Sequence, residues 1–273
     1  MDWRQVRDYK ARMPSAVQLD SDGAVARLTL ARPDSRNALG PELISDLFAA
    51  LDRVEENPEI RAVVLTGEGS AFSAGADLRA MRAMADATPE QNRYDAREMG
   101  SLFHRIDSFS RPVVARVAGP AIGGGVGLMA ACDVVVAADS AFFAFSEVRL
   151  GIVPAVISPF CVRRLGPAVA TRLFMTAQRI SATDAHRYGL VDEVVSDDAL
   201  DSAVDAVLAD LLAAGPEALR EVRGLVEMVS SIPVEQALDR TVELIARLRA
   251  TDEAREGMSA FLNKTRPSWV RKH

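Results

Sequence analysis

The sequence predicts an α/β fold that is followed by a helical C-terminal region. Over the first two-thirds of the 273 residues, short apolar runs alternate with segments of helical periodicity. After about residue 198 no convincing strand pattern follows. Repeated strand–helix units of this kind imply an α/β architecture.

Four apolar segments have the pattern of strands. Residues 24–30 alternate between apolar and polar side chains, which predicts a half-buried strand. Three denser apolar runs predict strands that are buried on both faces: 60–67, 112–119 and 133–138.

Helical spacing fills the segments between these runs. Residues 41–57 carry apolar side chains at helical spacing and begin with Pro41, which suits a first helical turn. Further helices are expected near 89–109 and 123–132.

The C-terminal region contains a strongly amphipathic helix at 233–250, followed by a last helix that ends at Pro267. The apolar stripe of the first consists of Val234, Ala237, Leu238, Thr241, Leu244, Ile245 and Leu248. Amphipathicity alone does not separate packing of this stripe on the chain's own core from a subunit interface.

Composition excludes several classes of function. The net charge of −6 leaves no basic stripe for a nucleic acid, although a few local cations would suffice for a small anionic ligand. Cys132 and Cys161 are predicted to be buried thiols, and the histidines form no ligand cluster, so we expect no metal. Without a signal-peptide core or an apolar run of membrane-spanning length, we expect a cytoplasmic protein.

Residues 121–133 read AIGGGVGLMAACD, with four glycines in five positions. One hypothesis is a dinucleotide site, because 125–130 fit G-x-G-x-x-A, but the next acidic residues, Asp133 and Asp139, come too early for the ribose-binding acid expected about 20 positions later. A second hypothesis makes Ser73 the nucleophile of a hydrolase, with His186 as its base. The strand before Ser73 ends near Thr66, however, which is too early for a nucleophile elbow.

The third reading is an oxyanion hole, which is a pair of backbone amides that stabilises a negatively charged oxygen. Gly124 would begin a helix, where N–H groups lack intrahelical partners and the helix dipole is positive. A second loop of small residues at 70–78 could supply the other amide for an enolate oxygen.

With these segments together, the sequence resembles the crotonase (enoyl-CoA hydratase/isomerase) superfamily over nearly its whole length. The matching pieces are ARPDSRNAL (31–39), AFSAGADL (71–78), GPAIGGGVGLMAACDVVVA (119–137), FSEVRLGIVP (145–154), ISATDAHRYGLVDEVV (180–195) and FLNKTRPSW (261–269). The resemblance implies the crotonase fold, whose repeated ββα units form a spiral core. It divides the chain into an N-terminal extension (1–16), a core with the acyl-CoA site (17–197) and a helical trimerisation region (198–273).

The resemblance also implies roles for individual residues. The backbone amides of Ala76 and Gly124 would hold a thioester enolate, and coenzyme A would be part of the substrate, with no separate cofactor. Phe261 and Lys264 would reach coenzyme A from a neighbouring subunit of a homotrimer or a dimer of trimers. Further residues expected to bind the substrate or its coenzyme A are Ala74, Gly75, Asp77, Leu78 and Gly123.

Glu147 matches one of the two glutamates that hydratases of this superfamily use, whereas Gly127 stands where the other would be. The resemblance therefore implies an enoyl-CoA hydratase or dehydratase with Glu147 as its single acid/base. The closest subgroup hydrates branched glutaconyl-type CoA esters of branched-chain amino acid degradation. In such a site Arg149 or Gly127 could contact the substrate, although Arg149 also fits a salt-bridged helix residue. A Δ3,Δ2-enoyl-CoA isomerase and a non-catalytic acyl-CoA-binding protein are the alternatives.

Overall fold

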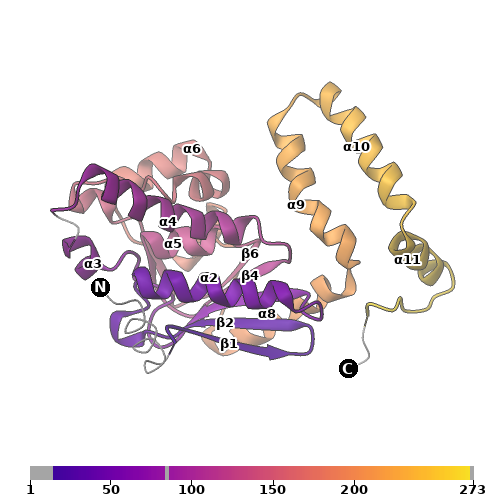
Figure 1. The fold of residues 1–273 in the computed structure, drawn as a ribbon, viewed down its shortest axis with the longest axis horizontal. Coiled ribbons are helices and arrows are strands. Elements are labelled where there is room, and N and C mark those ends of the chain that lie inside the picture. Colours follow the sequence, from indigo (N-terminus) through magenta and orange to yellow (C-terminus); the bar gives the residue numbers. More distant parts are fainter. Residues whose placement is uncertain (1–14, 84–85, 271–273) are drawn as a thin grey trace, which may run out of the picture.

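A six-stranded sheet forms the centre of the protein (Figure 1), which a computed structural model describes over residues 15–83 and 86–270. The strands are, in their order across the sheet, β1 (Val17–Asp22), β2 (Val25–Leu30), β3 (Ala62–Gly67), β4 (Val113–Val117), β6 (Val134–Ala138) and β9 (Glu193–Val195). β1 runs antiparallel to β2, and the other neighbours are parallel. The four strands predicted from the sequence are β2, β3, β4 and β6, and the α/β fold class is confirmed.

A second, three-stranded sheet lies where the glycine run begins. It consists of β5 (Ala121–Ile122), β7 (Phe142–Ala144) and β8 (Ile180–Ser181), with β5 parallel to β7 and β7 antiparallel to β8. These strands are too short to stand out in the sequence. They matter because β5 leads directly into the helix that carries the glycines.

Helices cover both faces of the large sheet. One face packs against a core contributed by α2 (Pro41–Glu56), α4 (Pro89–Asp107), α5 (Gly124–Ala130) and α6 (Ser158–Thr176). The other face packs against α8 (Leu200–Ala213). Alternate residues of each strand serve the two faces, so that Leu65 of β3 lies in the first core and Val64 in the second.

Shorter elements connect these layers. They are α3 (Leu78–Ala83), α7 (Ala182–Arg187) and three 3₁₀ segments, η1 (Pro33–Ser35), η2 (Glu147–Leu150) and η3 (Asp197–Ala199). Local sequence explains several helix boundaries. α2 and α4 carry Pro41 and Pro89 in their first turns, and Thr88 forms a capping box with Gln91 at the start of α4.

The last helices extend away from the core as a C-terminal arm, residues 216–270 (Figure 1). The arm consists of α9 (Pro216–Ser231), α10 (Val234–Arg249), α11 (Asp252–Leu262) and a tail. Trp269 of the tail donates its indole N–H to the Ala213 carbonyl at the end of α8, at 3.2 Å. Arg61 of the core donates to the Trp269 carbonyl at 2.6 Å, so the tail is fastened to the core at both groups.

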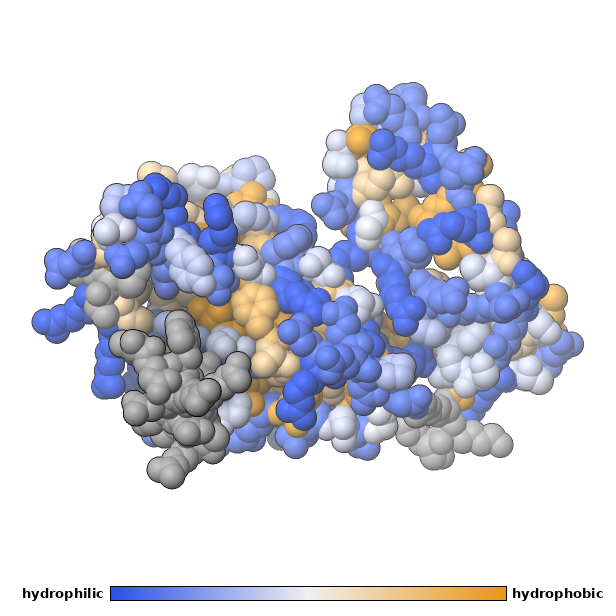
Figure 2. All heavy atoms as spheres, viewed as in Figure 1, coloured by the Kyte–Doolittle hydropathy of each residue, from blue (hydrophilic) through white to orange (hydrophobic). Residues whose placement is uncertain are grey.

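The predicted apolar stripe of α10 is divided between two sides of the helix. Ala237 is buried and Leu244 half-buried within the arm, whereas Val234, Leu238 and Ile245 are exposed. Figure 2 shows apolar side chains at the surface of the arm. The core of the chain therefore does not cover the whole stripe, because α10 packs chiefly against its neighbours α9 and α11.

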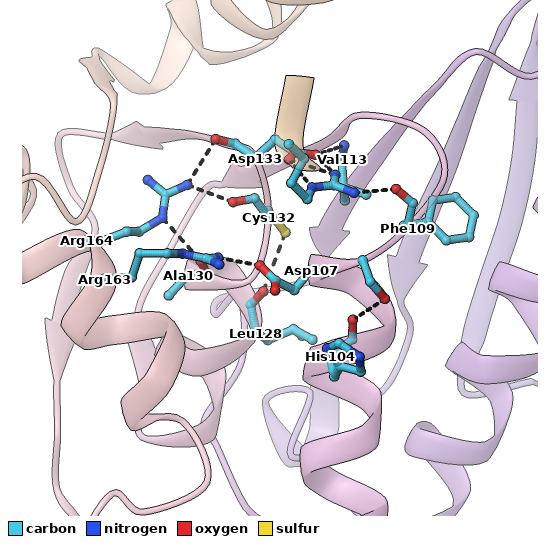
Figure 3. Close-up of polar contacts among 12 residues, drawn as sticks. His104, Asp107, Phe109, Val113, Leu128, Ala130, Cys132, Asp133, Arg163 and Arg164 are labelled. Carbon is cyan, nitrogen blue, oxygen red and sulfur yellow. Dashed lines mark hydrogen bonds and ion pairs between the residues drawn. The ribbon is translucent and has the colours of Figure 1, made fainter. Parts of the chain in front are cut away.

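A polar cluster joins the arm to the C-terminal end of α5 (Figure 3). Arg164 of α6 donates to the carbonyls of Ala130, Cys132 and Asp133 at 3.2, 2.7 and 3.1 Å, where α5 has carbonyls without intrahelical partners. Arg223 of α9 forms an ion pair with Asp133 at 2.6 Å and donates to the Phe109 carbonyl. Cys132 is buried here, and Cys161 is buried in the same core, as predicted.

No helix within residues 15–83 and 86–270 is long and apolar enough to cross a lipid bilayer.

We predict that Arg223→Ala loosens the attachment of α9. The Asp133 carboxylate would lose a half-buried partner that bonds both of its oxygens, which lowers the free energy of unfolding by about 1–2 kcal/mol. Hydrogen–deuterium exchange should become faster in α9, while strands β3 and β4 stay protected. Arg93→Ala, which removes an exposed ion pair with Glu90, is the control and should change neither. Unchanged exchange in α9 would contradict the anchoring role.

Candidate active site

The glycine run forms the turn from β5 into α5. Gly123 has φ 51° and ψ −117°, a conformation that favours glycine, and its N–H donates to the Ala144 carbonyl at 2.8 Å. Gly124 then begins the helix, so its N–H has no intrahelical acceptor. Within the described residues, no other acceptor is found for this amide.

The loop at 70–78 presents a second free amide to the same place. Leu39 donates to the Gly75 carbonyl at 2.7 Å and accepts from the Asp77 N–H at 3.2 Å. In this bridge the intervening N–H of Ala76 points away from Leu39. It too has no acceptor among the described residues.

A Cβ atom placed on each glycine shows how closely the two segments that carry the amides approach each other. A carbon added to Gly124 would lie 3.5 Å from the Ala76 nitrogen, and one added to Gly75 would lie 3.1 Å from the Gly124 nitrogen. Gly75 also has φ 86°, and its added carbon would lie 2.4 Å from the Ile122 carbonyl oxygen. Glycine is therefore required at this contact, and the structure brings together the predicted pair, Ala76 and Gly124.

Glu147 lies beside these amides. It opens η2, and its Oε1 would be 2.8 Å from a carbon added to Gly123, directly before the first turn of α5. Its Oε2 is buried without a hydrogen-bond partner in the described part of the chain. Burial raises the pKa of Glu147, and a hydrogen bond from its own backbone amide lowers it by a smaller amount. The site thus contains a carboxyl group whose pKa is raised by burial.

Ile157 occupies the place that a side chain at position 127 would need. Gly127 is buried, and an added carbon would lie 2.2 Å from Ile157 Cγ2 and 3.5 Å from Phe103 Cζ. No second carboxylate fits there without movement of Ile157. The sequence offered no signal for this residue, because a single isoleucine before a helix does not show which distant glycine it covers.

Arg149 has a structural contact that the sequence analysis did not foresee. Its guanidinium donates to the Ala177 carbonyl at 3.0 Å, at the end of α6, rather than to a carboxylate. The side chain thus satisfies a carbonyl that follows the last helical turn.

The residues expected around coenzyme A fall into two separate places. Ala74, Gly75, Asp77 and Leu78 belong to the Ala76 loop, and Asp77 accepts from the Arg79 N–H at 2.8 Å at the start of α3. Phe261 belongs to the last turn of α11 and Lys264 follows that helix, which lies on the opposite side of the molecule from α3 (Figure 1), and Phe261 is 84% exposed. One chain by itself does not bring the two groups together.

The geometry does not support a serine hydrolase. Ser73 donates to the Asn37 carbonyl at 2.8 Å, and His186 Nδ1 lies 3.1 Å from the Val191 carbonyl, so the two do not form a nucleophile–base pair. Among the described residues, no group of three His, Cys, Asp or Glu side chains is placed to hold a metal ion.

Comparison with known proteins relates this chain to enoyl-CoA hydratases and isomerases. A profile of the family described as enoyl-CoA hydratase/isomerase matches residues 20–272. A crystal structure of an enoyl-CoA hydratase from Shewanella pealeana is 34% identical, covers 98% of this chain and 100% of its own, and superposes with a TM-score of 0.90. The short-chain-enoyl-CoA hydratase of Clostridium acetobutylicum is 32% identical over 91% of this chain and 95% of its own length. The 2,3-dehydroadipyl-CoA hydratase of Escherichia coli is 33% identical over 90% and 94%.

We predict that Gly127→Ala destabilises the protein by about 1–3 kcal/mol, since its added carbon overpacks the contact with Ile157. Gly224→Ala in α9 is the matched control. Nothing lies within 4 Å of the carbon it adds, so better helix propensity should stabilise it by about 0.5–1 kcal/mol.

Combining Gly127→Ala with Ile157→Ala should cost less than the sum of the two single changes, because each relieves the other. Urea unfolding of the four variants measures these differences. Additive costs would show that the two positions are not in contact.

Proposed function

From the premise that this chain belongs to the enoyl-CoA hydratase/isomerase family, we propose that it adds water to the double bond of a 2-enoyl-CoA thioester, with Glu147 as its single acid/base. The observation that carries the proposal is the placement of one buried, unpartnered carboxyl oxygen beside two free backbone amides. The amides belong to Ala76 and Gly124, and they would bind the thioester oxygen.

The reaction needs a proton acceptor and a place for negative charge. The Glu147 carboxylate takes a proton from water as the hydroxyl oxygen bonds to C3 of the substrate. The electron pair of the double bond moves into the thioester, which becomes an enolate whose oxygen accepts both N–H groups. The protonated Glu147 then delivers the proton to C2, so that the net change is the addition of one water molecule.

Two features of the site favour these steps. Preorganised amides stabilise charge that develops in the transition state, and removal of one such donor typically costs about 10²–10³ in rate. The raised pKa of Glu147 makes its carboxylate a better base and keeps the proton available for return to C2.

The single carboxyl group also bears on the class of substrate. Position 127 is a glycine covered by Ile157, so it supplies no second glutamate to hold the water molecule. A dicarboxylic or branched glutaconyl-type thioester would bring a carboxylate of its own, which could orient that water. The relative named 2,3-dehydroadipyl-CoA hydratase acts, by its name, on a dicarboxylic thioester, which supports including such substrates in a test.

Isomerisation of a 3-enoyl-CoA is the second candidate, and the same observation favours it. One carboxyl group suffices to move a proton between C4 and C2, while the enolate oxygen stays at the two amides. A non-catalytic acyl-CoA-binding protein would keep the amides but would not need a carboxyl group with a raised pKa.

Coenzyme A binding and assembly are part of the proposal. The Ala76 loop and Gly123 would contact one part of the substrate, and Phe261 and Lys264 of a neighbouring subunit would contact coenzyme A, with the lysine facing phosphate charge. The exposed apolar residues of the arm, among them Val234, Leu238 and Ile245, would be covered in a homotrimer or a dimer of trimers.

We predict that Glu147→Gln lowers kcat by at least about 10²–10³-fold and leaves binding of butyryl-CoA within about twofold. The assay offers crotonyl-CoA, a branched and a dicarboxylic 2-enoyl-CoA, and a 3-enoyl-CoA, and follows the absorbance of the enoyl thioester. In the wild type, loss of absorbance indicates hydration, and its appearance from the 3-enoyl substrate indicates isomerisation.

The pH profile should carry the same signature. Burial raises the pKa of Glu147, so the base is lost to protonation at a higher pH than for an exposed glutamate, and the acid limb of kcat/KM moves upward. Glu56→Gln, at an exposed position, is the matched control and should leave rate and profile unchanged. Full turnover by Glu147→Gln would disprove the catalytic assignment, and tight binding without turnover by the wild type would favour the binding protein.

For the assembly, we predict a trimeric or hexameric mass in sedimentation equilibrium, shifted toward monomer by Leu238→Glu. A charge on the exposed apolar side of α10 would have to be buried in the interface, which is unfavourable. Leu238→Met keeps the position apolar and should leave the mass unchanged. A monomeric wild type would contradict the assembly and the contribution of Lys264 from a neighbour.

A further inference from the structure

Ser73 lies in the loop that carries the Ala76 amide and contacts the segment that leads to the Gly124 amide, although neither free amide is its own. Its side chain is fully buried. Its backbone forms a bridge with Ala121 of β5, and its carbonyl accepts the Ile122 N–H at 3.0 Å. Ser73 thus belongs to the Ala76 loop and is bonded to the strand that leads into Gly124.

The hydroxyl of Ser73 is engaged on both sides. It donates to the Asn37 carbonyl at 2.8 Å and accepts from the Gly75 N–H at 3.3 Å. The second bond holds the Ala74–Gly75 peptide unit, and the next unit, which carries the Ala76 N–H, is held at its Gly75 carbonyl by the Leu39 N–H. The Ser73 hydroxyl and the Leu39 N–H thus hold Gly75 from both sides, and the orientation of the Ala76 amide depends on that of Gly75.

Asn37 makes the other end of this connection rigid. It is fully buried with φ 55°, a conformation that asparagine tolerates better than most residues. Its side-chain amide donates to the carbonyls of Glu68 and Ala71, both at 2.9 Å, and its oxygen accepts the Arg32 N–H at 2.9 Å. The carbonyl that receives the Ser73 hydroxyl is thus fixed by three side-chain hydrogen bonds.

Ser73 also contacts the first turn of α5. A carbon added to Gly125 would lie 2.4 Å from the Ser73 carbonyl oxygen and 2.9 Å from its Cβ. The helix that begins at Gly124 therefore rests directly on this residue. One side of Ser73 orients the loop of the Ala76 amide, and the other supports the helix of the Gly124 amide.

We propose that Ser73 is a positioning residue of the oxyanion hole, whose hydroxyl acts with the Leu39 N–H to hold Gly75 and thereby the direction of the Ala76 amide relative to that of Gly124. This inference rests on the proposed function, since it assumes that these two amides bind the thioester oxygen. Ser73 acts through Gly75 and does not touch the reacting atoms. Its loss would tilt one of two donors, and small errors of alignment in such a pair are costly in rate.

The test compares Ser73→Ala with the wild type in two measurements. Steady-state kinetics with the best enoyl-CoA should show kcat reduced about tenfold and KM changed by less than about twofold, since a misdirected donor loses part of the effect of a removed one. Infrared difference spectra of bound butyryl-CoA, labelled with ¹³C at its carbonyl, report polarisation of that carbonyl directly. The downward shift of its stretching frequency on binding should be smaller in the variant.

Thr66→Val is the matched control. Thr66 is also buried, and its hydroxyl donates to the Arg116 carbonyl at 3.0 Å. It lies two residues after Val64 on strand β3, so both side chains are on the face of the sheet that α8 covers. Loss of this hydroxyl should lower the unfolding temperature and leave kcat and the carbonyl frequency unchanged. Ser73→Cys, which keeps a weaker donor of similar shape, should give an intermediate frequency and serves if the alanine variant does not fold.

The outcomes separate this inference from the proposed function. If bound butyryl-CoA shows no downward shift in the wild type, the oxyanion hole itself is wrong and the role of Ser73 falls with it. If the carbonyl frequency of bound butyryl-CoA falls equally in the wild type and in Ser73→Ala, the oxyanion hole is supported and the positioning role of Ser73 is overturned. A reduced shift with unchanged pH dependence of the Glu147 limb supports the inference.

Discussion

The close approach of two backbone segments, the loop at 70–78 and the first turn of α5, is the contact on which the rest of the site depends. A carbon on Gly75 would lie 2.4 Å from the Ile122 oxygen, and a carbon on Gly125 at the same distance from the Ser73 oxygen. Side chains are excluded at this contact, which is why both segments are rich in small residues. Because the segments touch, an amide from each faces the same small volume, and neither amide has an acceptor within residues 15–83 and 86–270.

Helix α5 is used at both of its ends. At the start, the positive end of its dipole and the free Gly124 N–H favour negative charge on a ligand, and the half-buried Glu147 side chain lies beside them. At the far end, Arg164 satisfies the carbonyls that follow the helix and brings positive charge to the negative end of the dipole. Such short helices depend on tertiary contacts, and this one has them on all sides.

The C-terminal arm has a different character from the core. Its helices pack mainly on one another, with apolar residues such as Leu238 and Ile245 left at the surface, and few polar contacts fasten it to the core. The position of Phe261 and Lys264 far from the Ala76 loop follows from this arrangement. In the proposed assembly, a second subunit would supply these two residues to the coenzyme A site.

The sequence by itself determined the α/β class, the four central strands and the glycine turn, and through its resemblance it predicted that Ala76, Gly124 and Glu147 form the active site. Each of these features is a local pattern or motif that spans only a few neighbouring residues. Three features were decided only by the tertiary structure: Ile157 over Gly127, the Asn37–Ser73 hydrogen bonds behind the Ala76 loop, and the division of the α10 stripe. Each joins residues that are distant in the chain or sets which face of a helix meets a neighbour. Periodicity and motif spacing do not encode such pairings, because they arise only when the whole core is packed.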